Sequence, residues 1–192
     1  MSDINRLIQR WQAGDERAAE AIYNQYRGLT FGLAFALLSN SADAEEVTQD
    51  SLTYALTNIG RYDAQQARFF TWLHTITVSR CRNKRRRRYL PSISLFAWLK
   101  KGRDITDPTP TPEHQALDGA LRDEAWQAIQ TLKPHHREAV VLRYWADFTY
   151  QEMAEILGCS ARAARSRLQS AHKQLGPILA QNELINLEET IQ

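Results

Sequence analysis

The sequence predicts an all-α protein with two small helical domains, residues 1–90 and 114–176, joined by a flexible linker. Three observations lead to this fold class. Apolar residues recur three and four positions apart, as on one face of a helix, and no segment alternates as a strand would. The 8 Gly and 6 Pro are concentrated at a few places instead of being spread along the chain. Finally, the stretch DPTPTPE (107–113) cannot be helical and separates two helix-rich regions.

The first two helices are expected between residues 3 and 38. Residues 3–13 read as a short helix with Asp3 as N-cap, which Gly14 ends. Asp15 can cap a second helix. The apolar segment 29–38 should be the buried helix of the first domain.

The next helix, residues 43–59, is predicted to present an acidic outer face. Asp43 and Glu46 fit an N-cap and its reciprocal carboxylate, and Gly60 closes the helix. Asp43, Glu46 and Asp50 are three and four positions apart, so the three carboxylates should share one face.

A long helix should run from Phe69 to Tyr89 and end before Pro91. Residues 80–103 carry 10 basic and no acidic side chains, whereas residues 1–79 carry 6 basic and 9 acidic ones. Such a block indicates a polyanion contact, and the alternative is a solvated charged face. Aromatic residues next to these cations suit single-stranded DNA, although Phe69 and Trp72 could equally fill the core.

The linker, residues 91–113, contains apolar residues that are unusual for a free tether. Ile93, Leu95, Phe96, Trp98 and Leu99 suggest a segment that docks on the protein itself or on a partner.

The second domain is expected to hold four helices and a tail. The helices cover about 114–131, 134–146, 150–157 and 161–175. In the second of them, Ala139, Val140, Leu142 and either Tyr144 or Trp145 should be buried. A capping box of Thr149 and Glu152 opens the third, and the fourth is capped by Ser160 and ended by Gly176 and Pro177. The tail, 177–192, could add a weak helix.

Residues 149–175 have the pattern of a helix-turn-helix. Ala154 is small enough to let the two helices approach, Gly158 permits the positive φ of the turn, and Ala164 is a small apolar residue on which the second helix can pack. The second helix would enter the major groove of DNA, where arginine can read guanine. Its exposed positions include Arg162, Arg165, Ser166, Arg167 and Gln169. An ordinary αα-hairpin with a solvated cationic face is the alternative.

Other classes of function find little support. Cys81 and Cys159 have no partner at metal spacing and are expected to be reduced. No His, Cys and carboxylate set, phosphate loop or nucleophile motif is present, so we expect no catalytic residue, metal, cofactor or small-molecule substrate. No signal region or membrane-length apolar run is apparent, which predicts a cytoplasmic protein.

The order of these elements resembles the extracytoplasmic-function (ECF) sigma factors of the sigma-70 family. The resemblance rests on DAEEVTQD (43–50), on RFFTWLHTITVSRCRNKRRRR (68–88), and on LKPHHREAVVLRYWADFTYQEMAEILGCSARAARSRLQSAHKQL (132–175). It implies a non-enzymatic subunit that binds core RNA polymerase, directs it to promoters and helps to open them. In the family, residues 1–90 would be sigma region 2 and residues 114–176 sigma region 4.

The resemblance also implies a role for individual residues. The surface that meets the clamp helices of the largest polymerase subunit would comprise Asp43, Glu46, Gln49 and Asp50. The −10 promoter element would meet Tyr62, Phe69, Phe70, Trp72, Ser79, Arg80, Asn83, Lys84, Arg85, Arg86, Arg87 and Arg88. The −35 element would meet Arg143, Thr149, Ser160, Arg162, Arg165, Ser166 and Arg167. Ser79 stands where many members have Asn.

Two further expectations concern partners. Region 4 would also meet the polymerase flap region, and an anti-sigma factor would keep the protein silent until it is needed. A stand-alone helix-turn-helix regulator is the main alternative, but it leaves the acidic helix and the basic helix without a task.

Overall fold

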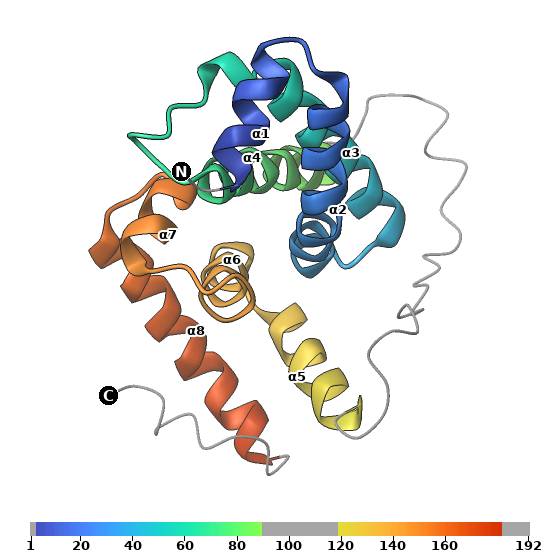
Figure 1. Ribbon diagram of the computed structural model, residues 1–192. Coiled ribbons are helices and arrows are strands. Elements are labelled where there is room, and N and C mark those ends of the chain that lie inside the picture. The colour runs from blue at the N-terminus through green and yellow to red at the C-terminus, as the bar shows by residue number, and fades with distance from the viewer. Residues whose placement is uncertain (1–2, 90–118, 182–192) are drawn as a thin grey trace. The chain divides into compact units, whose positions relative to one another are not determined.

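The computed structural model describes residues 3–89 and 119–181, and all regular structure in these two ranges is helical (Figure 1). Two compact units divide the chain after Thr106, inside the segment that is not described. The all-α prediction is confirmed. The predicted linker 91–113, the start of the helix at 114 and the end of the tail lie outside the described residues.

The N-terminal unit contains four helices and one short turn of 3₁₀-helix. They are α1 (Asp3–Gln12), α2 (Glu16–Leu38), α3 (Ser41–Thr57), η1 (Ile59–Arg61) and α4 (Phe69–Tyr89). Asp15 caps α2 as predicted, since its side chain accepts a hydrogen bond from the Arg17 backbone N–H. The apolar segment 29–38 is the second half of α2, and Leu29 at its start is 49% exposed.

The predicted start of α3 at Asp43 is wrong. Asn40 is the N-cap, and its side chain accepts from the Asp43 N–H at 2.8 Å. The preceding Ser39 adopts a left-handed conformation, with φ of 54°, which turns the chain sharply between α2 and α3. Gly60 does not close the helix either, because α3 ends at Thr57 and Gly60 lies inside η1.

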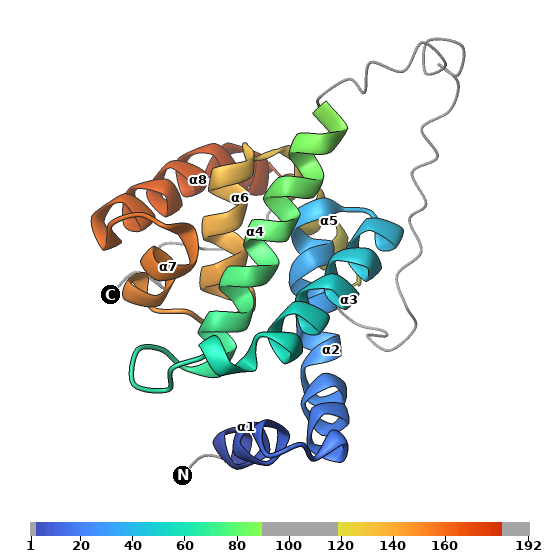
Figure 2. The ribbon, with the colours of Figure 1, turned by 90° about the horizontal axis from the view of Figure 1, so that it is seen from above.

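The core of the N-terminal unit is formed where α1, α3 and α4 meet α2 (Figure 2). Its fully buried side chains include Ile22, Leu33, Leu52, Phe69 and Leu73. Burial of one such side chain stabilises a fold by about 1.5–3 kcal/mol, so these contacts determine how α4 is held.

The C-terminal unit also consists of helices. They are α5 (Gly119–Thr131), α6 (Pro134–Val140), the π-helical turn η3 (Val141–Trp145), α7 (Tyr150–Leu157) and α8 (Ala161–Gln181). Both α6 and α7 pack on α8, and their core includes Leu142, Phe148, Met153, Ala164 and Leu168.

The prediction that Tyr144 or Trp145 is buried is wrong. Their exposed fractions are 49% and 59%. The cause is η3, in which the Ala146 N–H donates to the Val141 carbonyl five residues earlier. This wider turn changes which side chains face inward, and Val141 and Phe148 are buried instead.

The prediction that Gly176 and Pro177 end the last helix is also wrong. α8 continues through both residues to Gln181. Its apolar stripe extends past the proline, from buried Leu168, Ala171 and Leu175 to half-buried Ile178. Tertiary packing therefore offsets the hydrogen bond that Pro177 cannot donate.

Candidate nucleic-acid interface

The acidic face of α3 and the basic half of α4 contact each other. Lys84 Nζ lies 2.5 Å from a Glu46 carboxylate oxygen and 3.3 Å from one of Asp43. Arg80 reaches Asp50 at 3.5 Å. The ammonium's hydrogen bonds to Glu46 and Asp43 raise the pKa of Lys84 above its usual value.

The three carboxylates differ in exposure. Asp43 was predicted to lie on the outer face, but its side chain is only 15% exposed, against 57% for Glu46 and 60% for Asp50. Asp43 therefore lies under Lys84 at the α3–α4 contact, and the other two carboxylates keep an open side towards solvent.

The last described turns of α4 present cations to solvent. Arg86 and Arg87 are exposed, and so are Ser79 and Asn83. Arg82 and Arg85 are half-buried, and the side chain of Arg88 lies outside the described part. Within that part, Arg86 and Arg87 have no carboxylate partner. A phosphate can reach these two cations directly.

The aromatic residues before the basic half divide into one core residue and three surface residues. Phe69 is 2% exposed, with ring centroids 5.0 Å from Tyr26 and 5.5 Å from Tyr62. Its ring faces no solvent, so the alternative that it fills the core holds. Tyr62, Phe70 and Trp72 are half-buried, and each keeps part of its ring accessible.

The helix-turn-helix geometry is present in the C-terminal unit. Thr149 and Glu152 form the predicted capping box. Gly158 adopts φ of 63°, which needs glycine for an unstrained turn, and Ser160 caps α8 by accepting from the Ala163 N–H. Ala154 and Ala164 are buried where α7 meets α8.

The N-terminal half of α8 is cationic and open. Arg162, Arg165 and Ser166 are exposed and Arg167 is half-buried, and none of the three arginines has a carboxylate partner in the described ranges. Arg143 and Arg165 both lie over the Tyr150 ring, 5.7 and 6.0 Å from its centroid. Arg143 also donates to the Phe148 carbonyl, which holds the turn before α7.

Two family models match the chain, one in each unit. The family model "Sigma-70 region 2" matches residues 22–89, and "Sigma-70, region 4" matches residues 122–175. The two matches fall in the two units and in the order that the resemblance requires. The chain belongs to the sigma-70 family. It is a promoter-specific sigma factor of the ECF type, a transcription initiation factor.

Individual relatives agree with this assignment along most of the chain. The sigma factor is 26% identical over 183 residues to RNA polymerase sigma-H factor of Pseudomonas aeruginosa, covering 91% of this chain and 94% of the relative. It is 26% identical to ECF RNA polymerase sigma factor SigW of Bacillus subtilis, covering 90% and 94%.

Two solved structures share the fold. The sigma factor RpoE of Bartonella quintana, in complex with the anti-sigma factor NepR, has a TM-score of 0.67 at 24% identity, covering 84% of this chain and 96% of that chain. CnrH, in complex with the cytosolic domain of CnrY, has a TM-score of 0.66 at 20% identity, covering 93% and 99%.

Several residues of this sigma factor's surfaces were missed by sequence reasoning. Glu45 binds Arg27 at 2.9 Å and accepts from Gln49, and these hydrogen bonds lower the pKa of the Glu45 carboxyl. Tyr150 underlies two arginines. Tyr144 Oη lies 2.9 Å from His172 Nε2. Among these residues, only Tyr150 had a signal in the sequence, because it directly follows the helix cap Thr149.

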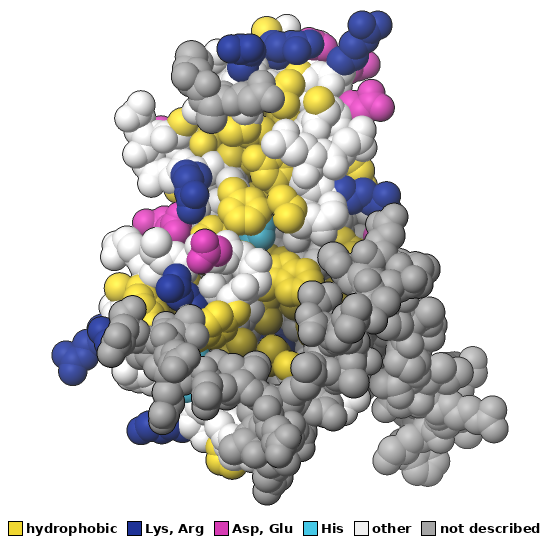
Figure 3. Space-filling view, turned by 60° about the horizontal axis from the view of Figure 1, so that its bottom comes forward, with side chains coloured by type: hydrophobic (Ala, Val, Ile, Leu, Met, Phe, Trp, Pro, Cys, Tyr) yellow, Lys and Arg dark blue, Asp and Glu magenta, His cyan; other side chains and the backbone are white. Residues whose placement is uncertain are grey.

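Two structural findings bear on other classes of function. None of the helices in the described ranges is long and apolar enough to cross a membrane. The same ranges hold no cluster of three His, Cys, Asp or Glu side chains that could bind a metal ion. On the face shown in Figure 3, Lys and Arg side chains stand in separate groups, some of them beside Asp or Glu.

Proposed function

We propose that this sigma factor binds core RNA polymerase through α3, holds the −10 element with the loop 62–68 and α4, and reads the −35 element with α8. One observation carries the proposal. A single chain presents an acidic helix, a second helix that carries both partly open aromatic rings and exposed cations, and a capped helix-turn-helix with arginines free of carboxylates.

The −35 reading is assigned to Arg162, Arg165, Ser166 and Arg167. They occupy the first turns of α8, which a helix-turn-helix places in the major groove. Arginine pairs with guanine through two hydrogen bonds. Ser160 and Thr149 use their side-chain oxygens as helix caps, so in this proposal they position α7 and α8, and Arg143 supports the same turn.

The −10 contact is assigned to Tyr62, Phe70 and Trp72, whose rings are accessible for base stacking, and to Ser79 and Asn83, which are exposed further along α4. Arg86 and Arg87 would neutralise the adjacent backbone, and Arg80, Lys84, Arg85 and Arg88 complete the set. Phe69 supports Tyr62 from the core.

The polymerase contact is assigned to Glu46, Gln49 and Asp50, with Asp43 underneath. Exposed carboxylates attract cations of a partner, and the clamp helices of the largest subunit are the partner that the family resemblance implies. Region 4 would also meet the flap region. Because Glu46 and Asp50 already bind Lys84 and Arg80, a polymerase cation would compete with these two residues.

A regulator is also part of the proposal. The solved structures that share the fold were determined with NepR and with the cytosolic domain of CnrY, and the first is described as an anti-sigma factor. We infer that an anti-sigma factor binds this chain too, and that the chain acts in the cytoplasm without catalysis, cofactor or small-molecule substrate.

Reconstitution with core RNA polymerase tests the proposed function. The complex should start transcription at a small set of sites on genomic DNA, and run-off mapping should show shared −10 and −35 sequences. The triple variant Asp43→Lys, Glu46→Lys, Asp50→Lys should lose co-purification with polymerase while circular dichroism still reports helix. Duplex binding by the free protein, without any start-site selection, would instead favour a stand-alone regulator.

A further inference from the structure

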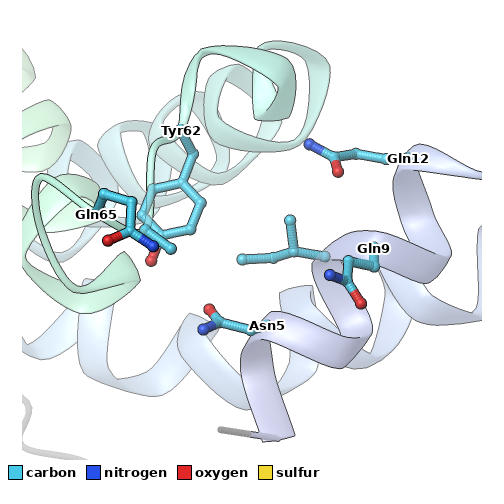
Figure 4. A pocket seen from close by; sticks show the side chains of 7 residues that line it. Asn5, Gln9, Gln12, Tyr62 and Gln65 are labelled. Carbon is cyan, nitrogen blue, oxygen red and sulfur yellow. The ribbon is translucent and has the colours of Figure 1, made fainter. Parts of the chain in front are cut away.

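The pocket of the N-terminal unit belongs to a surface that the proposed function already uses. Asn5, Gln9 and Gln12 of α1 line one side of it, and Tyr62 and Gln65 of the loop after η1 line the other (Figure 4). That loop is assigned to the −10 element. The C-terminal unit, in contrast, carries a cationic and aromatic face that the −35 assignment uses only in part.

Cations on the exposed face of α8 extend beyond the turns assigned to the −35 element. Arg162, Arg165 and Lys173 are exposed, and positions 162, 165, 169 and 173 share one face of the helix because they are three and four residues apart. Neither these cations nor the half-buried Arg167 have a carboxylate partner in the ranges that the structure describes. This face therefore attracts an anionic partner along most of the helix.

One flank of this face is aromatic. The Tyr150 ring lies under Arg165, with 6.0 Å from the guanidinium carbon to the ring centroid. Nearer to the C-terminal end of α8, the Tyr144 ring contacts the His172 ring at 5.8 Å between centroids. Tyr144 and Tyr150 are 49% and 36% exposed, so both rings keep apolar surface open to solvent. A partner that fits this face combines carboxylates with aliphatic side chains.

The acidic segment, residues 182–192, follows α8 and has this composition. Its charged residues are Glu183, Glu188 and Glu189, and it contains no Lys, Arg or His. Between the first and the second of these carboxylates stand the aliphatic residues Leu184, Ile185 and Leu187. Because the segment belongs to the same chain as α8, its effective concentration there is high, and weak contacts suffice to hold it.

The acidic segment is long enough to return along α8. At a rise of about 1.5 Å per residue, His172 lies about 14 Å before Gln181, the last residue of the helix, and Arg165 lies about 24 Å before it. An extended chain spans about 3.3 Å per residue, so positions 184–187 can return about 10–20 Å and positions 188–189 about 23–26 Å. The aliphatic residues therefore reach the level of His172, and the two carboxylates reach that of Arg165.

We propose that the acidic segment docks on this face of α8 and competes with promoter DNA for its arginines. The aliphatic residues cover the open side of the Tyr144 ring, and Glu188 and Glu189 pair with Arg165 and Arg167. The inference rests on the proposed −35 contact, because a base or phosphate that approaches the same arginines must displace the two carboxylates. Exposed ion pairs are weak, so DNA can displace the segment, at a cost in affinity.

Amide NMR spectra of the free, full chain test the contact. In the variant Glu188→Gln, Glu189→Gln, the amide signals of residues 162–173 should shift from their wild-type positions, because the segment loses its ion pairs with α8. The control Glu16→Gln, Glu20→Gln removes the same charge from exposed positions of α2 and should leave these signals unchanged. Each substitution keeps the size and polarity of the side chain, and thermal unfolding should show that both variants remain folded.

Promoter binding tests the competition. Start-site mapping first supplies a promoter that the holoenzyme uses. At low salt, holoenzyme with the Glu188→Gln, Glu189→Gln variant should bind this promoter about three- to tenfold more tightly than wild type, because each exposed ion pair changes an equilibrium a few-fold. The α2 control should stay within about twofold of wild type. The gain should shrink as salt is raised, because salt screens exposed ion pairs.

The outcomes separate the two proposals. If the holoenzyme selects no start site, the proposed function fails, while the amide signals still decide whether the segment contacts α8. If these signals are the same in wild type and in the Glu188→Gln, Glu189→Gln variant, the docking inference is overturned. It is also overturned if promoter binding does not strengthen, since the segment would then lie away from the DNA-reading face. Shifts that grow with protein concentration would assign the face to a second chain and contradict docking within one chain.

Discussion

The two arginine-rich helices of this sigma factor differ in what their cations already bind. On α4, Arg80 and Lys84 are paired with the carboxylates of α3. On α8, Arg162, Arg165 and Arg167 have no carboxylate partner in the described ranges, and Arg165 lies over an aromatic ring. A cationic run in a sequence therefore does not say which of its charges are available.

The difference follows from the neighbours of each helix. α4 packs against α2 and α3, and α3 brings Asp43, Glu46 and Asp50 to its flank. α8 packs on α6 and α7 through alanines and leucines, and of its arginines Arg162 and Arg165 are exposed while Arg167 is half-buried. We expect the described neighbours of α8 to leave it open to DNA, whereas part of α4 must exchange partners.

The largest difference between the units that hold the two helices is expected in how acid affects their stability. Burial lowers the pKa of His74, on α4, from 6.5 to about 4, so the folded N-terminal unit excludes a proton that the unfolded chain accepts. The neutral His74 therefore contributes its full stabilisation above pH 6.5, the unfolded pKa. As pH falls from there to about 4, the free energy of unfolding should drop by about 3 kcal/mol. Urea unfolding of the full chain between pH 7 and 4, followed by amide NMR signals from each unit, measures it.

The variant His74→Phe should remove most of this acid sensitivity from the N-terminal unit. His172 on α8 is only half-buried, and burial lowers its pKa as it lowers that of His74. His172→Phe is thus the control, and it should change the acid profile of the C-terminal unit only. Equal acid sensitivity with and without His74 would contradict the assignment.

Loss of one α8 arginine should have the next largest effect. Arg165→Ala should weaken promoter binding by the holoenzyme about 10- to 100-fold, corresponding to about 1–3 kcal/mol for a base contact. The measurement is a filter-binding or footprinting titration, with −35 variants to show relaxed specificity. Lys173→Ala, an exposed cation later on α8, is the control. If both variants lost the same affinity for the promoter, the effect of Arg165 would be one of charge alone and not of a base contact.

Neutralising the α3 carboxylates should make α4 behave more like α8. In the variant Asp43→Asn, Glu46→Gln, Asp50→Asn, Lys84 and Arg80 lose their ion-pair partners. Non-specific DNA binding by the free protein should then strengthen several-fold, and the slope of log K against log salt should steepen by up to about 2, one for each freed cation. An unchanged slope would show that these cations do not reach DNA.

The smallest effect is expected from Lys84 alone. Lys84→Met should cost less than about 1 kcal/mol of unfolding free energy, the range of ion pairs near the surface. The pKa of Lys84 is raised in the fold, so its contribution is complete below 10.5, the unfolded value, and is lost as pH rises beyond it. Urea titrations at pH 8 and pH 11 should therefore show wild type and variant converging at the higher pH.

Local signals in the sequence were sufficient for much of the fold. The capping box at Thr149 and Glu152, the cap at Asp15 and the turn at Gly158 depend on residues a few positions apart, and the structure confirms them. Errors arose where one local signal was mistaken for another, as with Asn40 capping α3 in place of Asp43, or where packing overrode a local signal, as with α8 passing through Pro177.

The candidate surfaces show the same division. Composition and helix periodicity indicated DNA binding, because both can be read from the sequence residue by residue. Association with polymerase was implied only by the resemblance to the ECF sigma factors. Tertiary structure decided that Phe69 is core, that the π turn η3 exposes Tyr144 and Trp145, and that Lys84 lies between two carboxylates 38 and 41 residues earlier in the chain. It also brought α1 against the loop at Tyr62, where the two line a pocket. These contacts join residues far apart along the chain, and helix packing selects them through buried area, which no short pattern encodes.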